Sequence, residues 1–171
     1  DTIDGGGGND TVYGEGGDDL IYGSLGSDTL NGGADTDTLT YANFTTSYVT
    51  ATLSSGSLTL SSGSAHLISN FEIYYFSNDS RGDHITGSAG DDEIYLLDGD
   101  DTYIASGGDD TIDGGNGSDT IDYSTQFGSL SITLADSGTT TVSIAAVAKD
   151  TISNIENISG TLTDDTITGN S

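Results

Sequence analysis

An aspartate stands at every ninth position in two stretches of the chain. Two residues after each one comes a large apolar residue, which is aliphatic everywhere except at Tyr103. This period does not match the 3.6-residue repeat of a helix, so it limits the fold to a short element and a turn repeated many times. The marker aspartates are Asp1, Asp10, Asp19, Asp28 and Asp37 in the first array, and Asp83, Asp92, Asp101, Asp110 and Asp119 in the second.

The residues ahead of each marker are rich in glycine, as in GGGGNDTVY (5–13) and GGNGSDTID (114–122). Glycine adopts positive φ without steric cost, so we expect turns here, each followed by a three-residue strand with one inward side chain. Two strands and two turns make a coil of 18 residues. Stacked coils would place the apolar residues in one thin core and the markers in two columns. The sequence therefore predicts an all-β fold of stacked coils, a β-solenoid.

The marker aspartates need a counter-ion once the coils stack. Neighbouring carboxylates would lie about 4.8 Å apart and would repel each other unless a cation lay between them. The chain has 28 Asp and Glu against 2 Lys and Arg, and it has no cysteine that could bind zinc. Oxygen ligands in flexible turns favour calcium, and we expect about four to seven Ca²⁺ ions. The candidate pairs are Asp1/Asp19, Asp10/Asp28, Asp19/Asp37, Asp83/Asp101, Asp92/Asp110 and Asp101/Asp119.

Both arrays resemble the haemolysin-type calcium-binding repeats of the RTX (repeats-in-toxin) family. The resemblance implies a right-handed parallel β-roll (β-solenoid), calcium held between successive turns by marker carboxylates and turn carbonyls, and type I secretion of the unfolded chain. It implies a secreted, extracellular or cell-surface location, within a large adhesin, S-layer protein or exoprotein. The implied metal ligands are the markers above together with Asp165. Three turns depart from the pattern, through Asp35 and Arg81 at glycine places and through the two leucines of LLDGDD (96–101).

Two spacers, residues 41–82 and 123–164, break the nine-residue period and resemble each other. They contain the alternating runs VTATL (49–53) and LSITL (130–134), followed by ISNFE (68–72) and ISNIE (152–156). Asp37 and Asp119 are 82 residues apart, so the chain is about two copies of one unit. Alternation of period two predicts strands with one buried face. We expect wider, calcium-free solenoid coils in the spacers, with a hairpin extension as the alternative.

We expect one continuous solenoid in five segments. Calcium-binding arrays occupy residues 1–40 and 83–122, β-rich spacers occupy 41–82 and 123–164, and a further repeat starts at 165–171. Asp136, in the second spacer, lies off the nine-residue period and is not expected to bind calcium. The larger apolar residues of the spacers are expected to thicken the core; they are Phe44, Phe71, Tyr74, Phe76 and Phe127.

Charge and residue content exclude several other functions. A net charge of −26 repels nucleic acid phosphates, and the chain has no apolar run suited to membrane insertion. The two histidines, His66 and His84, have no catalytic partners at a recognisable spacing, so we expect no enzyme. The expected partners are calcium and neighbouring repeats of the parent protein. Two alternatives stay open: a carbohydrate- or ice-binding solenoid face, with cell-surface glycans as partner, and an accessory module of a secreted enzyme.

Overall fold

Short strands make up nearly all of the regular structure. The structure, a computed structural model, describes residues 1–44, 47–134, 140–144 and 149–169. The strands of the first half are β1 (Thr2–Asp4), β2 (Thr11–Gly16), β3 (Leu20–Tyr22), β4 (Thr29–Ala34), β5 (Thr38–Thr40), β6 (Val49–Thr52), β7 (Ser57–Leu60), β8 (Ala65–Ser69), β9 (Ile73–Tyr75) and β10 (His84–Thr86). Those of the second half are β11 (Glu93–Tyr95), β12 (Thr102–Ile104), β13 (Thr111–Asp113), β14 (Thr120–Asp122), β15 (Leu130–Thr133), β16 (Thr140–Thr141), β17 (Ser143–Ile144), β18 (Thr151–Ser153), β19 (Asn157–Ser159) and β20 (Thr166–Thr168). One 3₁₀ turn, η1 (Leu53–Ser55), joins β6 to β7.

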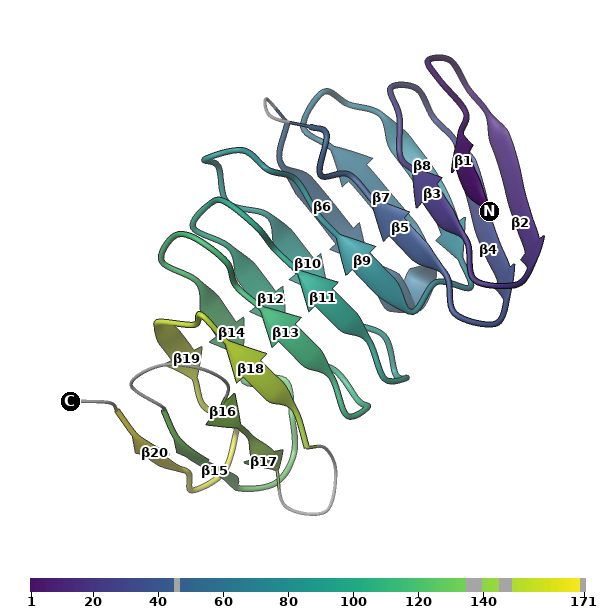
Figure 1. Cartoon of the computed structure of the whole chain (residues 1–171). Helices are drawn as coiled ribbons and strands as arrows, with labels where there is room; N and C mark the ends of the chain where they lie inside the picture. Colours follow the sequence, from purple (N-terminus) through teal and green to yellow (C-terminus); the bar gives the residue numbers. More distant parts are fainter. Residues whose placement is uncertain (45–46, 135–139, 145–148, 170–171) are drawn as a thin grey trace.

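Successive strands of the arrays alternate between two parallel sheets, which lie one behind the other in Figure 1. The first sheet has the order β1-β3-β5-β9-β11-β13-β18-β16, and the second has the order β19-β14-β12-β10-β6-β7-β8-β4-β2. Within an array the register step is 18 residues, as in the pairing of Ile3 with Ile21 and of Ile21 with Leu39. The predicted parallel β-roll is confirmed.

The core is a double column of inward side chains, one from the middle of each short strand. Because the pleat turns alternate side chains to opposite faces, a three-residue strand buries its central residue and leaves its flanks outside. Ile112, for example, is 0% exposed. Tyr103 occupies the same place in β12 and is also fully buried. The buried central residues of the array strands are Val12, Ile21, Leu30, Leu39, Ile85, Ile94, Tyr103, Ile112 and Ile121.

The tight turns need left-handed backbone at two of their six residues. In the turn 114–119 these are Gly115 (φ 90°) and Gly117 (φ 146°). Asp35 and Leu97, which replace glycine in two of the departing turns, have φ of 82° and 75°. Such conformations cost a non-glycine residue on the order of 1–3 kcal/mol. These turns therefore keep the glycine backbone path despite their sequences.

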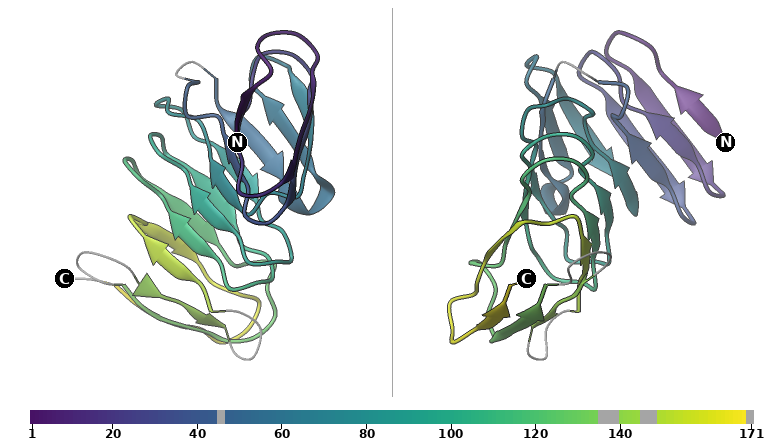
Figure 2. Two further views of the ribbon diagram at one scale, coloured as in Figure 1. Left: turned by 45° about the vertical axis from the view of Figure 1, so that its right-hand side comes forward. Right: turned by 60° about the vertical axis from the view of Figure 1, so that its left-hand side comes forward.

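The first spacer adds an antiparallel meander to the second sheet only. Strand β7 pairs antiparallel with both β6 and β8, β8 lies beside β4, and β6 lies beside β10. In the first sheet, by contrast, β5 and β9 are direct neighbours. The hairpin alternative therefore describes this spacer. Two extra strands lengthen one sheet by about 10 Å relative to the other. Figure 2 shows the consequence, since the purple and blue N-terminal coils are inclined to the green coils.

The second spacer repeats this pairing, with β18 and β16 on the first sheet and with β17, β15 and β20 in a separate three-stranded sheet. Strand β18 joins the first sheet beside β13, and β16 pairs antiparallel with β18. Strand β17 then pairs antiparallel with β15, which lies parallel to β20. Equivalent strands of the two units lie in different sheets, as β5 does in the first sheet and β14 in the second. The reason is that the chain crosses from one sheet to the other an odd number of times within one unit.

The aromatic residues of the spacers divide between core and surface. Phe71, Tyr74 and Phe76 are buried, and Phe44 packs against the core, 5.6 Å from the ring of Tyr41. The expectation for Phe127 is wrong, because its side chain is 74% exposed. It lies in the connection between β14 and β15, outside both sheets, so no facing strand covers it.

Candidate calcium sites

The marker aspartates form columns at the turns, as their spacing predicts. In five markers the backbone N–H donates to Oδ1 of the marker one coil further along, at 2.9 Å from Asp19 to Asp37 and 2.9 Å from Asp101 to Asp119. The same bond joins Asp10 to Asp28, Asp83 to Asp101 and Asp92 to Asp110. One carboxylate oxygen of these markers is therefore used by the protein itself, and the second oxygen decides what else each site can hold.

In five markers the second oxygen is buried and has no hydrogen-bond partner among the described residues. A buried carboxylate oxygen without a partner is costly, and a cation is the simplest group that removes the cost. The five atoms are Oδ2 of Asp10, Asp19, Asp37, Asp101 and Asp119.

A glycine opens a space beside several of these oxygens. A Cβ at Gly14 would lie 2.2 Å from the carbonyl oxygen of Gly32 and 2.4 Å from Oδ2 of Asp19. A carboxylate and a carbonyl from the next coil thus converge where only glycine leaves room. Both are ligands that calcium prefers. No three acidic or histidine side chains within the described ranges form a metal cluster by themselves, so an ion here requires such carbonyls. The donor set fits calcium.

Burial, together with neighbouring carboxylates, makes two of these carboxylates hard to ionise. Desolvation raises the pKa of Asp101 to about 8 and that of Asp119 to about 6. A divalent cation beside them would favour the ionised form and reverse this effect. At Asp101 the first residue of the turn is the buried Leu96 instead of glycine, so this turn lacks the opening seen at Gly14.

Protein donors hold the second oxygen of the other internal markers. Oδ2 of Asp110 accepts a hydrogen bond from the hydroxyl of Tyr103 at 2.9 Å. Oδ2 of Asp92 accepts from the backbone N–H of Ser88 at 2.9 Å. Asp83 is held in the same way by the N–H and hydroxyl of Ser77. These carboxylates are satisfied without a metal.

Asp28 accepts a hydrogen bond from a serine and lies beside a buried histidine. Its Oδ2 accepts a hydrogen bond from the hydroxyl of Ser24 at 2.8 Å and lies 3.2 Å from Nδ1 of His66. Both side chains of the His66–Asp28 pair are fully buried. Burial lowers the pKa of His66, although the carboxylate of Asp28 acts in the opposite direction. The ring of Tyr41 packs edge-on against His66 and closes the turn.

The two predicted markers nearest the chain ends occupy different surroundings. Asp1 is exposed, and its amino group contacts Oδ1 of Asp19 at 2.6 Å. Oδ1 of Asp165 accepts hydrogen bonds from the N–H of Leu130 and the hydroxyl of Thr161, and its Oδ2 accepts one from the N–H of Thr161. These bonds lower the pKa of Asp165. Asp136 lies outside the described residues.

Four spacer residues extend the marker columns and were missed in the sequence. Oε2 of Glu72 accepts the N–H of Asp37 at 2.9 Å, and Oε2 of Glu156 accepts that of Asp119 at 2.8 Å. Oδ1 of Asp150 accepts the N–H of Asp110, and its Oδ2 accepts the hydroxyl of Tyr123. His66 takes the corresponding place beyond Asp28. The available signal was the alignment of AHLISNFE (65–72) with KDTISNIE (149–156).

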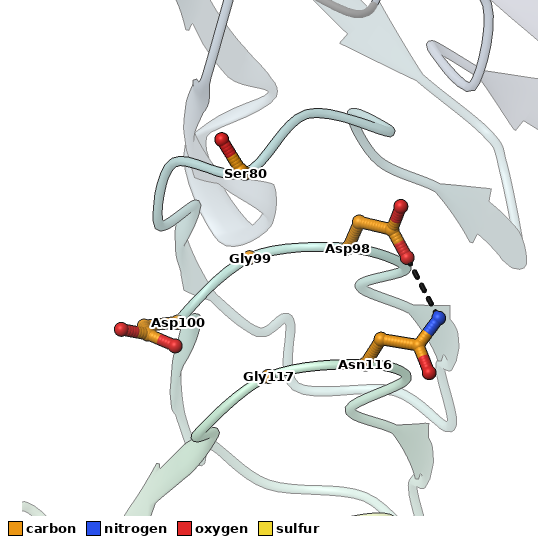
Figure 3. Close-up of a pocket in the computed structure, with 6 residues that line it drawn as sticks. All are labelled: Ser80, Asp98, Gly99, Asp100, Asn116 and Gly117. Atoms are coloured by element: carbon orange, nitrogen blue, oxygen red, sulfur yellow. Dashed lines mark hydrogen bonds between the residues drawn. The ribbon is translucent and has the colours of Figure 1, made fainter.

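A second row of polar side chains lies on the outer rim of the turns in the second array. Figure 3 shows Asp98 and Asp100 on one turn above Asn116 on the next. Nδ2 of Asn116 donates to Oδ1 of Asp98 at 2.8 Å. Together with Ser80 these residues line an open hollow of about 360 Å³. The rim carries negative charge but is stabilised by hydrogen bonds within the protein.

Comparison with known proteins identifies the arrays. The family model described as the RTX calcium-binding nonapeptide repeat (4 copies) matches residues 4–39, 78–108 and 97–126. No curated protein matches the chain. Among solved structures it is similar to the extracellular lipase LipA from Serratia marcescens, with 15% identity and a TM-score of 0.36. That match covers 91% of this chain and 36% of the lipase chain. Among the described residues there is no helix able to span a membrane. From its arrays, this chain belongs to the family of RTX calcium-binding nonapeptide repeat proteins.

Proposed function

We propose that this chain is a structural module that binds several calcium ions and folds when it does so outside the cell. The observation that carries the proposal is the set of five marker oxygens that are buried without a partner. Groups of this kind oppose folding until a cation reaches them. The family match supports calcium as that cation.

The ions lie at the markers whose second oxygen is open. Asp19 is the clearest internal site, because Oδ2 of Asp19 and the carbonyl of Gly32 converge beside Gly14. Asp10 has the open oxygen and a glycine beside it, since a Cβ at Gly5 would lie 3.1 Å from its Oδ2, but no carbonyl oxygen is among the nearest atoms. Asp101 has the open oxygen but Leu96 in place of that glycine. Asp28, Asp83, Asp92, Asp110 and Asp165 are held by protein donors and serve as calcium-independent parts of the columns.

Calcium supplies the charge that the thin core cannot offset. With a formal charge of −26 on 171 residues, the chain repels itself in the low calcium of a cell interior. Extracellular calcium modules bind with dissociation constants of about 10⁻⁴–10⁻³ M, so export would switch the chain to its folded form. Unfolded passage through a type I secretion channel agrees with this order of events.

The parent protein is a large secreted adhesin, S-layer protein or exoprotein in which this whole chain is a non-catalytic structural segment. The alternatives are a carbohydrate- or ice-binding face and an accessory module of a secreted enzyme. The stacked rings of Tyr75 and Tyr95, 4.3 Å apart and parallel, each cover one face of the other, so neither ring has both faces free for a sugar. A glycan array and an ice-affinity assay on the folded module test the first alternative. Binding in either assay would mean that the module is a ligand-binding face and not only a structural segment.

The decisive experiment is a crystal structure grown in calcium, with the ions identified by anomalous scattering. We expect an ion beside Asp19 and none beside Asp110, Asp92 or Asp83. Empty turns at every open marker would refute the proposal.

A further inference from the structure

We propose that each array ends in an additional calcium site that the spacer completes. In the first unit the site is formed by Asp37, Asn70 and Glu72, and in the second by Asp119, Asn154 and Glu156. The inference rests on the proposed calcium-binding function, and it extends the sites beyond marker pairs 18 residues apart into spacers that the sequence suggested were free of calcium.

At the end of the first array, an open oxygen faces a carbonyl from the spacer. Asp37 is fully buried, and its Oδ2 has no partner among the described residues. A Cβ at Gly32 would lie 2.1 Å from the carbonyl oxygen of Asn70 and 2.7 Å from Oδ2 of Asp37. This matches the arrangement beside Gly14, with Asn70 in place of the next turn's glycine. The spacer therefore supplies the carbonyl that a further repeat would have supplied.

The end of the second array has the same geometry on the opposite sheet. Asp119 is fully buried with an unpartnered Oδ2. A Cβ at Gly114 would lie 2.1 Å from the carbonyl oxygen of Asn154 and 2.7 Å from Oδ2 of Asp119. The two sites come from different parts of the sequence and lie on different sheets. Their agreement shows an arrangement built into the repeated unit.

Each asparagine is held so that its backbone carbonyl oxygen lies near the open carboxylate oxygen of the marker. Asn70 and Asn154 have left-handed backbone, with φ of 55° and 52°, a conformation that asparagine tolerates better than most residues. Nδ2 of Asn70 donates to Oδ1 of Asn31 at 2.9 Å, and Nδ2 of Asn154 donates to Oδ1 of Asp113 at 2.7 Å. Both amides thus anchor the short turn to the preceding coil.

Each glutamate supplies the second carboxylate of its site. Oε2 of Glu72 accepts the backbone N–H of Asp37, just as Oδ1 of Asp37 accepts the backbone N–H of Asp19. Glu156 has the same relation to Asp119. Only one residue separates Asn70 from Glu72, whereas four separate Gly32 from Asp37. The longer glutamate side chain restores the reach that the shortened turn gives up. Two carboxylates and a carbonyl are a donor set for calcium.

The test counts calcium ions per chain by native mass spectrometry, at a calcium concentration that just saturates the unaltered protein. Glu72→Gln and Glu156→Gln should each lower the count by one, and the double variant should lower it by two. Glu15→Gln, which removes an exposed carboxylate in another glycine-rich turn, is the matched control and should leave the count unchanged. Circular dichroism in saturating calcium establishes that each variant is folded.

Two outcomes separate this inference from the proposed function. An unaltered protein that binds no calcium would remove the proposed function itself. An unaltered protein that binds several ions, with the same count in folded Glu72→Gln and Glu156→Gln variants, would overturn only the closing sites. If a variant does not fold, anomalous scattering from the unaltered protein decides instead: ions beside Gly32 and Gly114 support the inference, and their absence there, with an ion beside Gly14, rejects it.

Discussion

The hydroxyl of Tyr103 donates a hydrogen bond to Oδ2 of Asp110 over 2.9 Å, between two side chains that are almost completely buried. Tyr103 is the residue that breaks the aliphatic rule of the arrays, and this bond accounts for the exception. A phenol on the core side of β12 reaches the turn and satisfies a carboxylate that would otherwise require another donor or an ion.

Replacing this phenol should destabilise the folded protein even in excess calcium. Tyr103→Phe leaves Oδ2 of Asp110 buried without its donor, which costs about 1–3 kcal/mol of the free energy of unfolding. Urea unfolding at saturating calcium measures the loss. Tyr13→Phe, at a side chain that is 60% exposed, is the control and should change little. Equal stability of the two variants would mean that the bond contributes nothing.

Removing the charge of an open marker should weaken calcium binding. In Asp119→Asn the amide oxygen can still accept the N–H of Asp101, but the open position then carries an uncharged NH₂ group. We expect the affinity of that site to fall at least about tenfold, since even outer-shell partners of metals typically contribute 10- to 100-fold. Calorimetric titration measures the change. Asp164→Asn, an exposed acid beside a marker, should leave the titration unaltered, and a similar fall in this variant would point to general charge effects.

Filling the space beside Asp19 should prevent calcium-dependent folding of the first coils. Gly14→Ala places a methyl group 2.2 Å from the carbonyl oxygen of Gly32, a distance that the backbone cannot accommodate unchanged. Gly16→Ala, two residues away, meets no atom within 4 Å and is the matched control. Hydrogen exchange of β2 to β5 in calcium should increase only in Gly14→Ala. Protection equal to that of the control would show that the space is not needed.

Withdrawal of calcium should unfold the arrays. In EDTA at low salt the far-ultraviolet circular dichroism should lose its β-sheet signal, because the buried marker oxygens and the charge of −26 are then uncompensated. Calcium should restore the signal, and magnesium should do so poorly, since it demands near-octahedral geometry and gives up its waters reluctantly. A spectrum that is the same with and without calcium would contradict folding on binding.

The thin core should be sensitive to the loss of one inward side chain. Ile112→Ala removes a fully buried residue from the first sheet and should cost about 2–5 kcal/mol of the free energy of unfolding in calcium. Leu25→Ala, at a side chain that is 57% exposed on a turn, should have little effect. Thermal unfolding in calcium compares the two. A small loss at Ile112 would mean that calcium ligation, not packing, dominates stability.

The sequence predicted the parts of the fold that depend on local repetition. A nine-residue step with one inward residue leaves few alternatives, so the strands, the register of 18 residues and the columns from Asp10 to Asp119 could all be expected. The direction of the spacer strands could not, because alternating residues such as those of β6 and β7 bury one face equally well in parallel and antiparallel pairing.

The chemical state of each marker depends on side chains distant in sequence. Asp19 and Asp110 look alike in the repeat, but one has an open oxygen and the other accepts a bond from Tyr103. Glu72 and Asn70 were hidden for a related reason, since the shortened turn changes both the spacing and the residue type. Comparison of the two spacers was the signal that pointed to them.

Because equivalent strands of successive units lie in opposite sheets, the orientation of a unit depends on whether an even or an odd number of units precedes it. The first meander lengthens the second sheet, whereas the strands β18 and β16 of the next spacer extend the first sheet, so the two insertions start on opposite sheets. A rod made of an even number of such units would keep its direction and present equivalent closing sites on alternating edges. Insertion or deletion of one unit would therefore place the surfaces of every later unit on the opposite side of the rod. The number of units, as well as their sequence, thus determines which surfaces share a side.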